Sequence, residues 1–173
     1  MSAFQVRRLD VMTSRDFGGL CDVLMDCVEG GASVSFMNPM TLPKAADFWR
    51  DVAASMARGE RAVIVAEDAG GRIIGTAQAI WATPENQPHR ADISKMLVHR
   101  RARRLGVGAA VLQAAERAAA ESGKTLLVLD TASDDAVRLY ERCGWQRVGT
   151  IPDYALWPGG GPCDTVVYYK RLD

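Results

Sequence analysis

The sequence lacks any hydrophobic stretch long enough to cross a bilayer, and residues 1–8 lack the apolar core of a secretory signal peptide. It also lacks net charge, because 21 basic residues balance 21 acidic ones. No field of the whole chain therefore draws it toward nucleic acid or an anionic membrane. We expect a cytoplasmic protein that binds neither.

Cysteine and histidine are scarce and scattered. The four cysteines include no C-x-x-C pair, and only His89 and His99 could join them as metal ligands. We expect no metal site and no disulfides, with Cys21 and Cys27 on the apolar face of a helix. Two histidines also give little material for a Ser–His–Asp or Cys–His arrangement, although residues distant in sequence can meet in a fold.

The length and the apolar spacing predict one α/β domain over residues 1–173. Two helices precede the main sheet, and a strand–helix–strand crossover makes its two strands parallel. The loop after the first of those strands lies at the carboxyl edge of the sheet, where ligands bind. The expected strands are 4–9, 62–66, 72–81, 92–98, 126–129, 145–150 and 166–169. The expected helices are one capped by Ser14 and ending near 30, then 43–59, 106–122 and 134–143, with loops at 83–88 and 152–162.

The crossover contains the most informative segment, residues 97–109, in which a strand enters a basic turn and then a helix. Gly106 and Gly108 lack a Cβ, so backbone N–H groups at the helix start can close on an anion. The helix dipole and four arginines within residues 100–104 add positive potential. The segment therefore suits a pyrophosphate, although a Gly-x-Gly alone is a weak signal and an arginine cluster is often only a solvated turn.

The segment has no third glycine of a dinucleotide fold and no Gly-Lys-Ser/Thr of a P-loop. Residues 103–108, Arg-x-x-Gly-x-Gly, resemble the R/Q-x-x-G-x-G/A signature of the GNAT acetyltransferases. Residues 136–145, Ala-x-x-Leu-Tyr-x-x-x-Gly-Trp, resemble the second motif of that family and follow on the expected elements. The resemblance implies the GNAT acyl-CoA N-acyltransferase fold: a mixed, mostly antiparallel sheet, flanked by helices, with one splayed parallel strand pair.

The resemblance also implies the donor and its site. Acetyl-CoA would give its acetyl group to an amine by direct attack in a ternary complex, without an acyl-enzyme and without a metal. A backbone N–H near residues 97 and 98 would meet the oxyanion. The expected coenzyme A contacts are Met96, Leu97, Val98, Arg103, Arg104, Leu105, Gly106, Val107, Gly108, Ala109, Ala136 and Tyr140.

Three side chains are candidates for the chemistry. Tyr140 is the expected acid: an ordinary tyrosine has a pKa of about 10 and a thiol about 8.5, so a phenol can protonate a nascent thiolate. For the base, Asp130 comes first and Asp92 second, each acting directly or through a water. The ordinary alternatives are a core aromatic for Tyr140 and a loop or helix cap for Asp130.

A closer resemblance to one group of acetyltransferases indicates the class of acceptor. Residues 30–37, 129–131 and 147–149 and Lys95 resemble strings of the tabtoxin-resistance acetyltransferases, which act on a β-lactam amino-acid toxin, whereas Asp92 replaces a glutamate of that group. This implies a small amino-acid-like amine, a toxin or antibiotic, as acceptor. Phe36, Met37, Trp81 and Tyr154 are expected to wall its pocket, unless they are ordinary packing residues.

Other functions remain open from the sequence. A protein N-terminal or lysine acetyltransferase is the second interpretation. A non-catalytic acyl-CoA sensor, or a module that binds RNA through the arginine turn, is the third. The oligomeric state is open, with a homodimer among the options.

Overall fold

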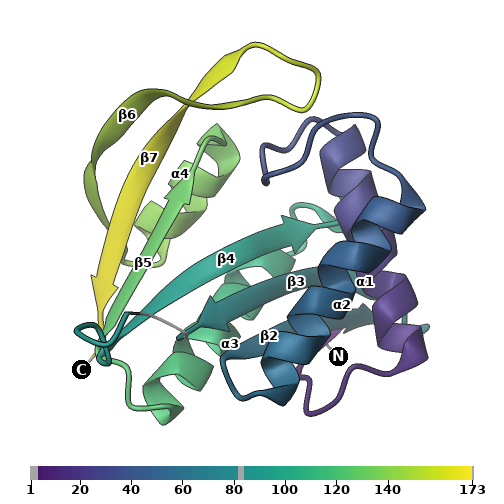
Figure 1. Cartoon of the computed structure of the whole chain (residues 1–173), viewed down its shortest axis with the longest axis horizontal. Helices are drawn as coiled ribbons and strands as arrows, with labels where there is room; N and C mark the ends of the chain where they lie inside the picture. The colour runs from purple at the N-terminus through teal and green to yellow at the C-terminus, as the bar shows by residue number, and fades with distance from the viewer. Residues whose placement is uncertain (1–3, 82–83, 173) are drawn as a thin grey trace.

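The computed structural model describes residues 4–81 and 84–172 of the chain. These residues form seven strands and four α-helices (Figure 1). The strands are β1 (Phe4–Arg8), β2 (Arg61–Asp68), β3 (Ile73–Ile80), β4 (Arg90–Val98), β5 (Leu126–Thr131), β6 (Gln146–Leu156) and β7 (Pro162–Arg171). The helices are α1 (Ser14–Glu29), α2 (Leu42–Ala57), α3 (Val107–Glu121) and α4 (Asp134–Arg142), with a short 3-10 helix η1 (Arg100–Ala102).

The strands make one mixed sheet in the order β1-β2-β3-β4-β5-β7-β6. All neighbours are antiparallel except β4 and β5, which are parallel. Their pairing lasts for three residue pairs, from Arg90 with Leu126 to Asp92 with Val128. Beyond Asp92 the two strands diverge, so the mostly antiparallel sheet with a splayed parallel pair is confirmed (Figure 1).

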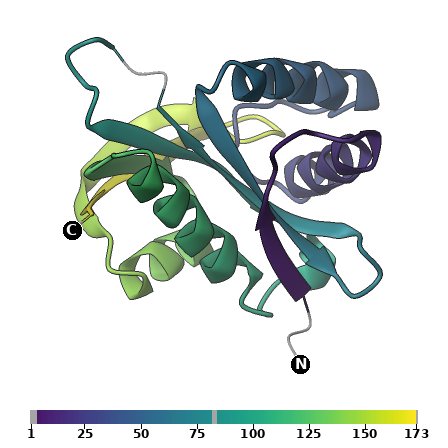
Figure 2. The same ribbon diagram turned by 90° about the horizontal axis from the view of Figure 1, so that it is seen from below.

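Helices cover both faces of the sheet, α1 and α2 on one and α3 on the other (Figure 2). Strand alternation divides the core accordingly. In β2, Val63 and Val65 join the cluster under α1 and α2, whereas Ala62, Ile64 and Ala66 join the cluster under α3. We call these the α1/α2 face and the α3 face.

The first helix begins one residue earlier than a Ser14 cap would allow. Thr13 is the N-cap: its side chain accepts a hydrogen bond from the Asp16 N–H, and the Asp16 carboxylate accepts one from the Thr13 N–H. This reciprocal capping box satisfies two backbone donors, whereas a Ser14 cap would satisfy fewer. The expected cap was therefore wrong by one position. Cys21 and Cys27 are buried on this helix, as expected.

The expected loop 152–162 was wrong, because β6 and β7 continue through most of it as a hairpin. Pro152 is tolerated because β6 is an edge strand, where a missing N–H removes no bond on the outer side. A bulge between Ile151 and Ala155 absorbs the irregularity, with Asp153 at a φ of 51°. Thr83, in the other expected loop, and residues 1–3 lie outside the described residues.

None of the helices in the described part of the chain has the length and apolar character needed to span a bilayer.

Candidate active site

The splay between β4 and β5 leaves backbone groups of β4 without strand partners. The His99 N–H donates to the Ile74 carbonyl at 2.9 Å, toward β3. Because backbone groups alternate along a strand, the Val98 N–H points to the opposite edge, which faces the splay, while the Val98 C=O accepts a hydrogen bond from the Cys27 thiol at 3.4 Å. Of the two backbone positions expected to meet an oxyanion, Val98 is therefore the one turned toward the gap. Leu97 instead pairs with Thr76 of β3.

The helix that follows β4 begins with backbone donors and no side-chain cap. Gly106 precedes α3 in the left-handed conformation, at a φ of 83°, and no side chain hydrogen bonds to the first turn. A Cβ at Gly106 would meet nothing within 4 Å, so its backbone conformation is what calls for glycine. Gly108 differs: a Cβ there would lie 3.2 Å from Cδ2 of Leu139, so this glycine lets α3 approach α4. Unpaired N–H groups at a helix start favour an anion.

Two of the four arginines in the turn bind to α1. Nε of Arg100 lies 2.9 Å from Oδ1 of Asp26, and the Arg100 backbone N–H donates to Oδ2 of Asp26 at 2.7 Å. Nη1 of Arg101 lies 3.3 Å from Oδ2 of Asp22. These contacts hold the turn against α1, which was not expected from the sequence.

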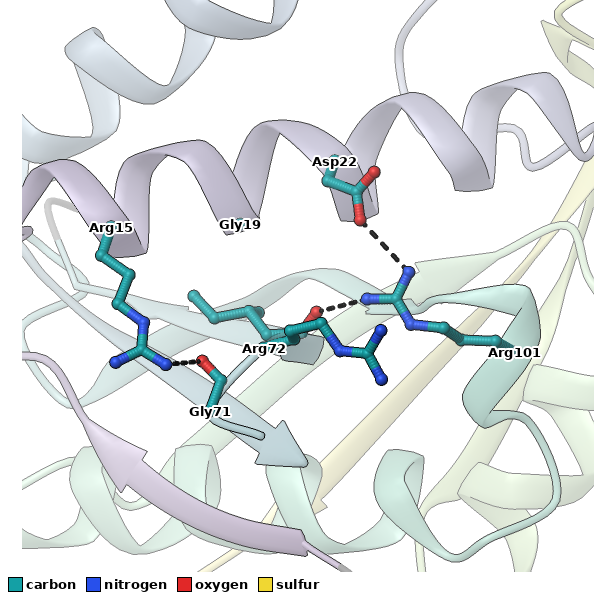
Figure 3. A pocket seen from close by; sticks show the side chains of 7 residues that line it. Arg15, Gly19, Asp22, Gly71, Arg72 and Arg101 are labelled. Carbon is teal, nitrogen blue, oxygen red and sulfur yellow. Dashed lines mark hydrogen bonds and ion pairs between the residues drawn. The ribbon is translucent and has the colours of Figure 1, made fainter. Parts of the chain in front are cut away.

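Arg101 also borders a surface cavity of about 270 Å³ between α1 and the start of β3 (Figure 3). Its Nη2 donates to the Ile73 carbonyl at 3.2 Å. The other guanidinium groups there are also engaged, Arg15 with the Gly71 carbonyl and Arg72 with Asp68. Protein oxygens thus already pair these arginines. The lining residues are Arg15, Gly19, Asp22, Gly71, Arg72, Ile73 and Arg101.

Arg103 and Arg104 have a different environment. Both are exposed beside the start of α3, and neither forms an ion pair with any residue in 4–81 or 84–172. Arg104 has a φ of 63°, which belongs to the tight turn before Gly106. These two arginines are the ones whose charge stays available to a phosphate.

Tyr140 of α4 is almost entirely buried, with 4% of its surface exposed. Its ring packs between Trp145 and Tyr168, with both centroids at 5.9 Å. Burial raises the pKa of Tyr140, and the charge of Asp130 raises it further, as does Cys143 once its thiol ionises. The phenol is therefore protonated at any physiological pH.

Asp130 lies exposed near the end of β5, on the side of the splay opposite β4. Its Oδ2 accepts a hydrogen bond from the Thr165 hydroxyl at 2.7 Å. The cap of α4 is Ser133, whose Oγ accepts from the Ala136 N–H, so Asp130 does not have the capping role. Sequence reasoning did not find Thr165, because the expected last strand, 166–169, began one residue after it, whereas β7 begins at Pro162.

Asp92 is the last residue of β4 that pairs with β5. Its Oδ2 lies 3.2 Å from Nη2 of Arg90. Burial raises the pKa of Asp92; the charge of Arg90 opposes this, and the nearby charge of Asp130 adds to it. Asp92 and Asp130 thus interact electrostatically.

The expected acceptor residues do not all come together. Phe36 lies in the loop between α1 and α2, where its ring meets Phe48 edge-on at 5.3 Å, and Met37 is exposed beside it. Tyr154 is exposed on β6. Trp81 lies elsewhere: it packs against the cluster of the α3 face and donates through Nε1 to the Gly59 carbonyl.

The α1–α2 loop touches the hairpin tip across the sheet. The Asn38 N–H donates to the Pro158 carbonyl at 2.9 Å, and the Ser33 hydroxyl donates to the Leu156 carbonyl at 3.4 Å. Figure 1 shows the two segments approaching each other beyond the ends of β4 and β5. They bridge one side of the splay, which we call the acceptor side because the expected acceptor residues Phe36, Met37 and Tyr154 lie in or next to these segments.

Lys95 of β4 was not among the expected site residues. It has a φ of 50° within the strand, and its Nζ lies 3.2 Å from Oγ of Ser35 and 5.6 Å from the ring centroid of Phe48. It therefore faces the α1–α2 loop, beside the splay. Residue type alone gave no signal, because most lysines on strands face solvent.

No group of three His, Cys, Asp or Glu side chains suited to a metal ion occurs within residues 4–81 and 84–172. The four cysteines are free thiols. The candidate site is therefore made of backbone donors, two arginines, two aspartates, a lysine and a buried tyrosine.

Comparison with known proteins identifies a family and a relative of similar length. The model of the acetyltransferase (GNAT) family matches residues 34–145. An uncharacterized N-acetyltransferase in the hisH-hisA intergenic region of Azospirillum brasilense is 29% identical over 167 residues, 93% of this chain and 96% of the relative.

Two solved structures share the fold. A phosphinothricin acetyltransferase from Sinorhizobium meliloti, in complex with acetyl-CoA, has a TM-score of 0.81 at 18% identity, over 98% of this chain and 89% of the other. A ribosomal-protein-alanine N-acetyltransferase from Brucella melitensis has a TM-score of 0.79 at 23% identity, over 97% and 99%. Enzymes named for different acceptors are thus about equally similar in fold.

Proposed function

Because the chain belongs to the acetyltransferase (GNAT) family, we propose that it transfers the acetyl group of acetyl-CoA to the primary amine of a small, amino-acid-like molecule. One observation carries the proposal. Strand β4 separates from β5 after Asp92, and the helix that follows β4 begins without a side-chain cap. The open edge of β4 suits the amide-containing arm of coenzyme A. The start of α3, one short turn later, has unpaired N–H donors that suit its pyrophosphate.

The residues fit that ligand. Backbone groups of β4 that face the splay would hold the amide-containing arm. The first turn of α3 after Gly106, with Arg103 and Arg104, would hold the pyrophosphate through N–H groups and mobile charge. Bound acetyl-CoA supplies an acetyl group activated as a thioester.

The side chains then divide the proton transfers. Asp130, held by Thr165, accepts the ammonium proton of the acceptor directly or through a water, and Asp92 is the second candidate. The Val98 N–H stabilises negative charge on the carbonyl oxygen. Tyr140 donates a proton to the departing sulfur. Its raised pKa weakens the phenol as an acid, but the same burial makes a thiolate more basic, so the transfer stays feasible.

The acceptor is small because the α1–α2 loop and the β6–β7 tip hydrogen bond to each other over that side of the splay. A folded protein could reach the site only if that bridge opened. The strings that resemble the tabtoxin-resistance acetyltransferases support an amino-acid toxin or antibiotic within this class. A protein N-terminus remains the alternative acceptor, favoured by the likeness to the Brucella enzyme.

The test measures coenzyme A release with free amino compounds and, separately, with peptides that carry the same amine. Turnover with the free compounds and little with the peptides supports the proposal, and the reverse supports the alternative. Thermal unfolding with acetyl-CoA is the control for binding: at a hundred times its Kd the ligand adds about 2.7 kcal/mol of stability. A stabilised protein that turns over no amine would be a sensor. RNA binding that weakens with salt and ignores acetyl-CoA would place the arginines in another role.

A further inference from the structure

Lys95 presents a cationic group on the acceptor side of the splay. Its Nζ donates one hydrogen bond to the Ser35 hydroxyl at 3.2 Å and lies over the Phe48 ring. An ammonium group has three donors. Two donors therefore remain for another group, in a place walled by the α1–α2 loop and α2.

No carboxylate of the described residues forms an ion pair with Lys95. Burial lowers the pKa of Lys95, the charge of Asp130 raises it, and the charge of Arg61 lowers it again. The surroundings add further donors: Arg61 occupies Oε1 of Gln78 at 2.8 Å, and the buried Nε2 of Gln78 has no partner among the described residues. Within the described part of the chain, the Nε2 donor of Gln78 on the α1/α2 face is thus left without an acceptor near Arg61.

The backbone at Lys95 is in a strained conformation that sets the direction of this side chain. Lys95 has a φ of 50° at the irregularity where the β3–β4 register shifts, between the pairs of Thr76 and Gln78. A non-glycine residue in the left-handed region is strained, and such residues collect at functional sites. The bulge turns Lys95 toward Ser35 and Phe48, whereas the Met96 side chain packs with the α3 face.

Lys95 and Asp130 carry opposite charges on the acceptor side. Their charges interact, but the two groups do not form an ion pair. Asp130 is exposed, and its hydrogen bond to Thr165 leaves acceptor capacity free. We propose that the acceptor is a zwitterion whose carboxylate binds Lys95 while its ammonium group faces Asp130. This rests on the proposed function, and it makes Lys95 the residue that selects carboxylate-bearing acceptors.

The inference separates acceptor classes. A free amino acid or a toxin that retains its carboxylate carries both charges at short separation. The N-terminal residue of a peptide has an amide where that carboxylate would be, and a lysine side chain in a protein has none nearby. Leaving a half-buried cation without its anion costs binding free energy, so an enzyme of this design discriminates against both.

The experiment compares two acceptor panels: free amino acids and the same amino acids as C-terminal amides. We expect kcat/KM for the free acids to exceed that for the amides by on the order of 10- to 100-fold, the range of a hydrogen bond to a charged group. In Lys95→Gln and Lys95→Met this ratio should fall toward one, while Lys95→Arg should retain most of it. Lys124→Gln is the matched control, since its ammonium binds the Pro88 carbonyl instead.

A binding measurement keeps the inference distinct from the reaction. Calorimetry with coenzyme A present measures the Kd of N-acetyl amino acids and of their amides, on wild type and on Lys95→Gln. A preference for the acids that Lys95→Gln loses supports the inference even if no amine is turned over, a result that would refute only the proposed function. Equal binding of acids and amides, no binding of either, or a preference that survives both neutral substitutions overturns it.

Discussion

Thr165 on β7 holds the carboxylate of Asp130 on β5, through a hydrogen bond of 2.7 Å from its hydroxyl to Oδ2. Thr165 is buried, with 2% of its surface exposed, whereas Asp130 is open to the splay. A buried donor thus fixes the direction of an accessible carboxylate. Such an arrangement suits a group that must accept a proton or position an amine.

Asp130→Asn should lower kcat/KM by on the order of 100-fold or more, because it removes a proton acceptor and its charge. Thr165→Val should lower it by about tenfold or less, because the carboxylate remains but loses one hydrogen bond. Both variants should bind acetyl-CoA with unchanged Kd, measured by calorimetry. Undiminished turnover in Asp130→Asn would remove this residue from the mechanism.

Asp92 should titrate differently when its neighbour is neutral. The charge of Asp130 is one cause of the raised pKa of Asp92, so in Asp130→Asn the Asp92 carboxyl should titrate at lower pH than in wild type. Carboxyl carbon NMR during a pH titration measures this directly. An unmoved Asp92 titration would show that the two carboxylates do not interact.

The same raised pKa has a consequence for stability. Its folded pKa lies above the ordinary 3.8, so the fold binds the proton more tightly than the unfolded chain does. The contribution of Asp92 to stability therefore falls as pH rises from about 3.8 through the folded pKa, and stays constant above it. The free energy of unfolding of Asp92→Asn, relative to wild type, should accordingly rise over that pH window in urea titrations.

Tyr140→Phe should lower kcat by on the order of 100-fold while acetyl-CoA binding persists, because an acid is lost and the ring packing against Trp145 and Tyr168 is kept. Because burial raises the pKa of Tyr140, ionisation of this phenol should not produce an alkaline limb in the kcat profile below pH 10. A kcat unchanged by the substitution would leave Tyr140 as a core residue only.

Sequence patterns predicted most of the fold because the strands and helices are strongly periodic and the turns carry Gly or Pro. They failed on the second half of β6, where Pro152 and Asp153 are typical of loops. Edge position and a bulge, which single-sequence patterns do not reveal, let those residues remain in a strand. Tertiary context overrode local propensity there.

The site was predictable only where a motif spans neighbouring positions. Gly106 and Gly108 belong to one motif, but for different reasons. Gly106 is required by its left-handed backbone conformation, and Gly108 by the close approach of Leu139, a difference visible only in three dimensions. The resemblance included Lys95 but gave it no role, because its placement comes from a bulge and from contacts with a loop 60 residues earlier. A single sequence does not give such distant contacts.

Arg103 and Arg101 offer a matched comparison, since they lie two positions apart in one turn. Arg103→Gln should raise the Kd of acetyl-CoA by about tenfold, because Arg103 forms no ion pair within the described residues and its charge is available to phosphate. Arg101→Gln should leave that Kd within about twofold, because Arg101 is bound to Asp22 and to the Ile73 carbonyl. It should instead lower stability by up to about 1 kcal/mol, as expected for a largely exposed ion pair.

Salt dependence sharpens this comparison. Charge–charge contacts with an exposed pyrophosphate are screened by ions, so the Kd of wild type and of Arg101→Gln should rise with salt. Arg103→Gln has lost one of those contacts, so its Kd should rise less steeply. Equal slopes for all three proteins, measured by calorimetry between low and physiological salt, would contradict a phosphate role for Arg103. They would leave the backbone N–H groups after Gly106 as the main anion-binding element.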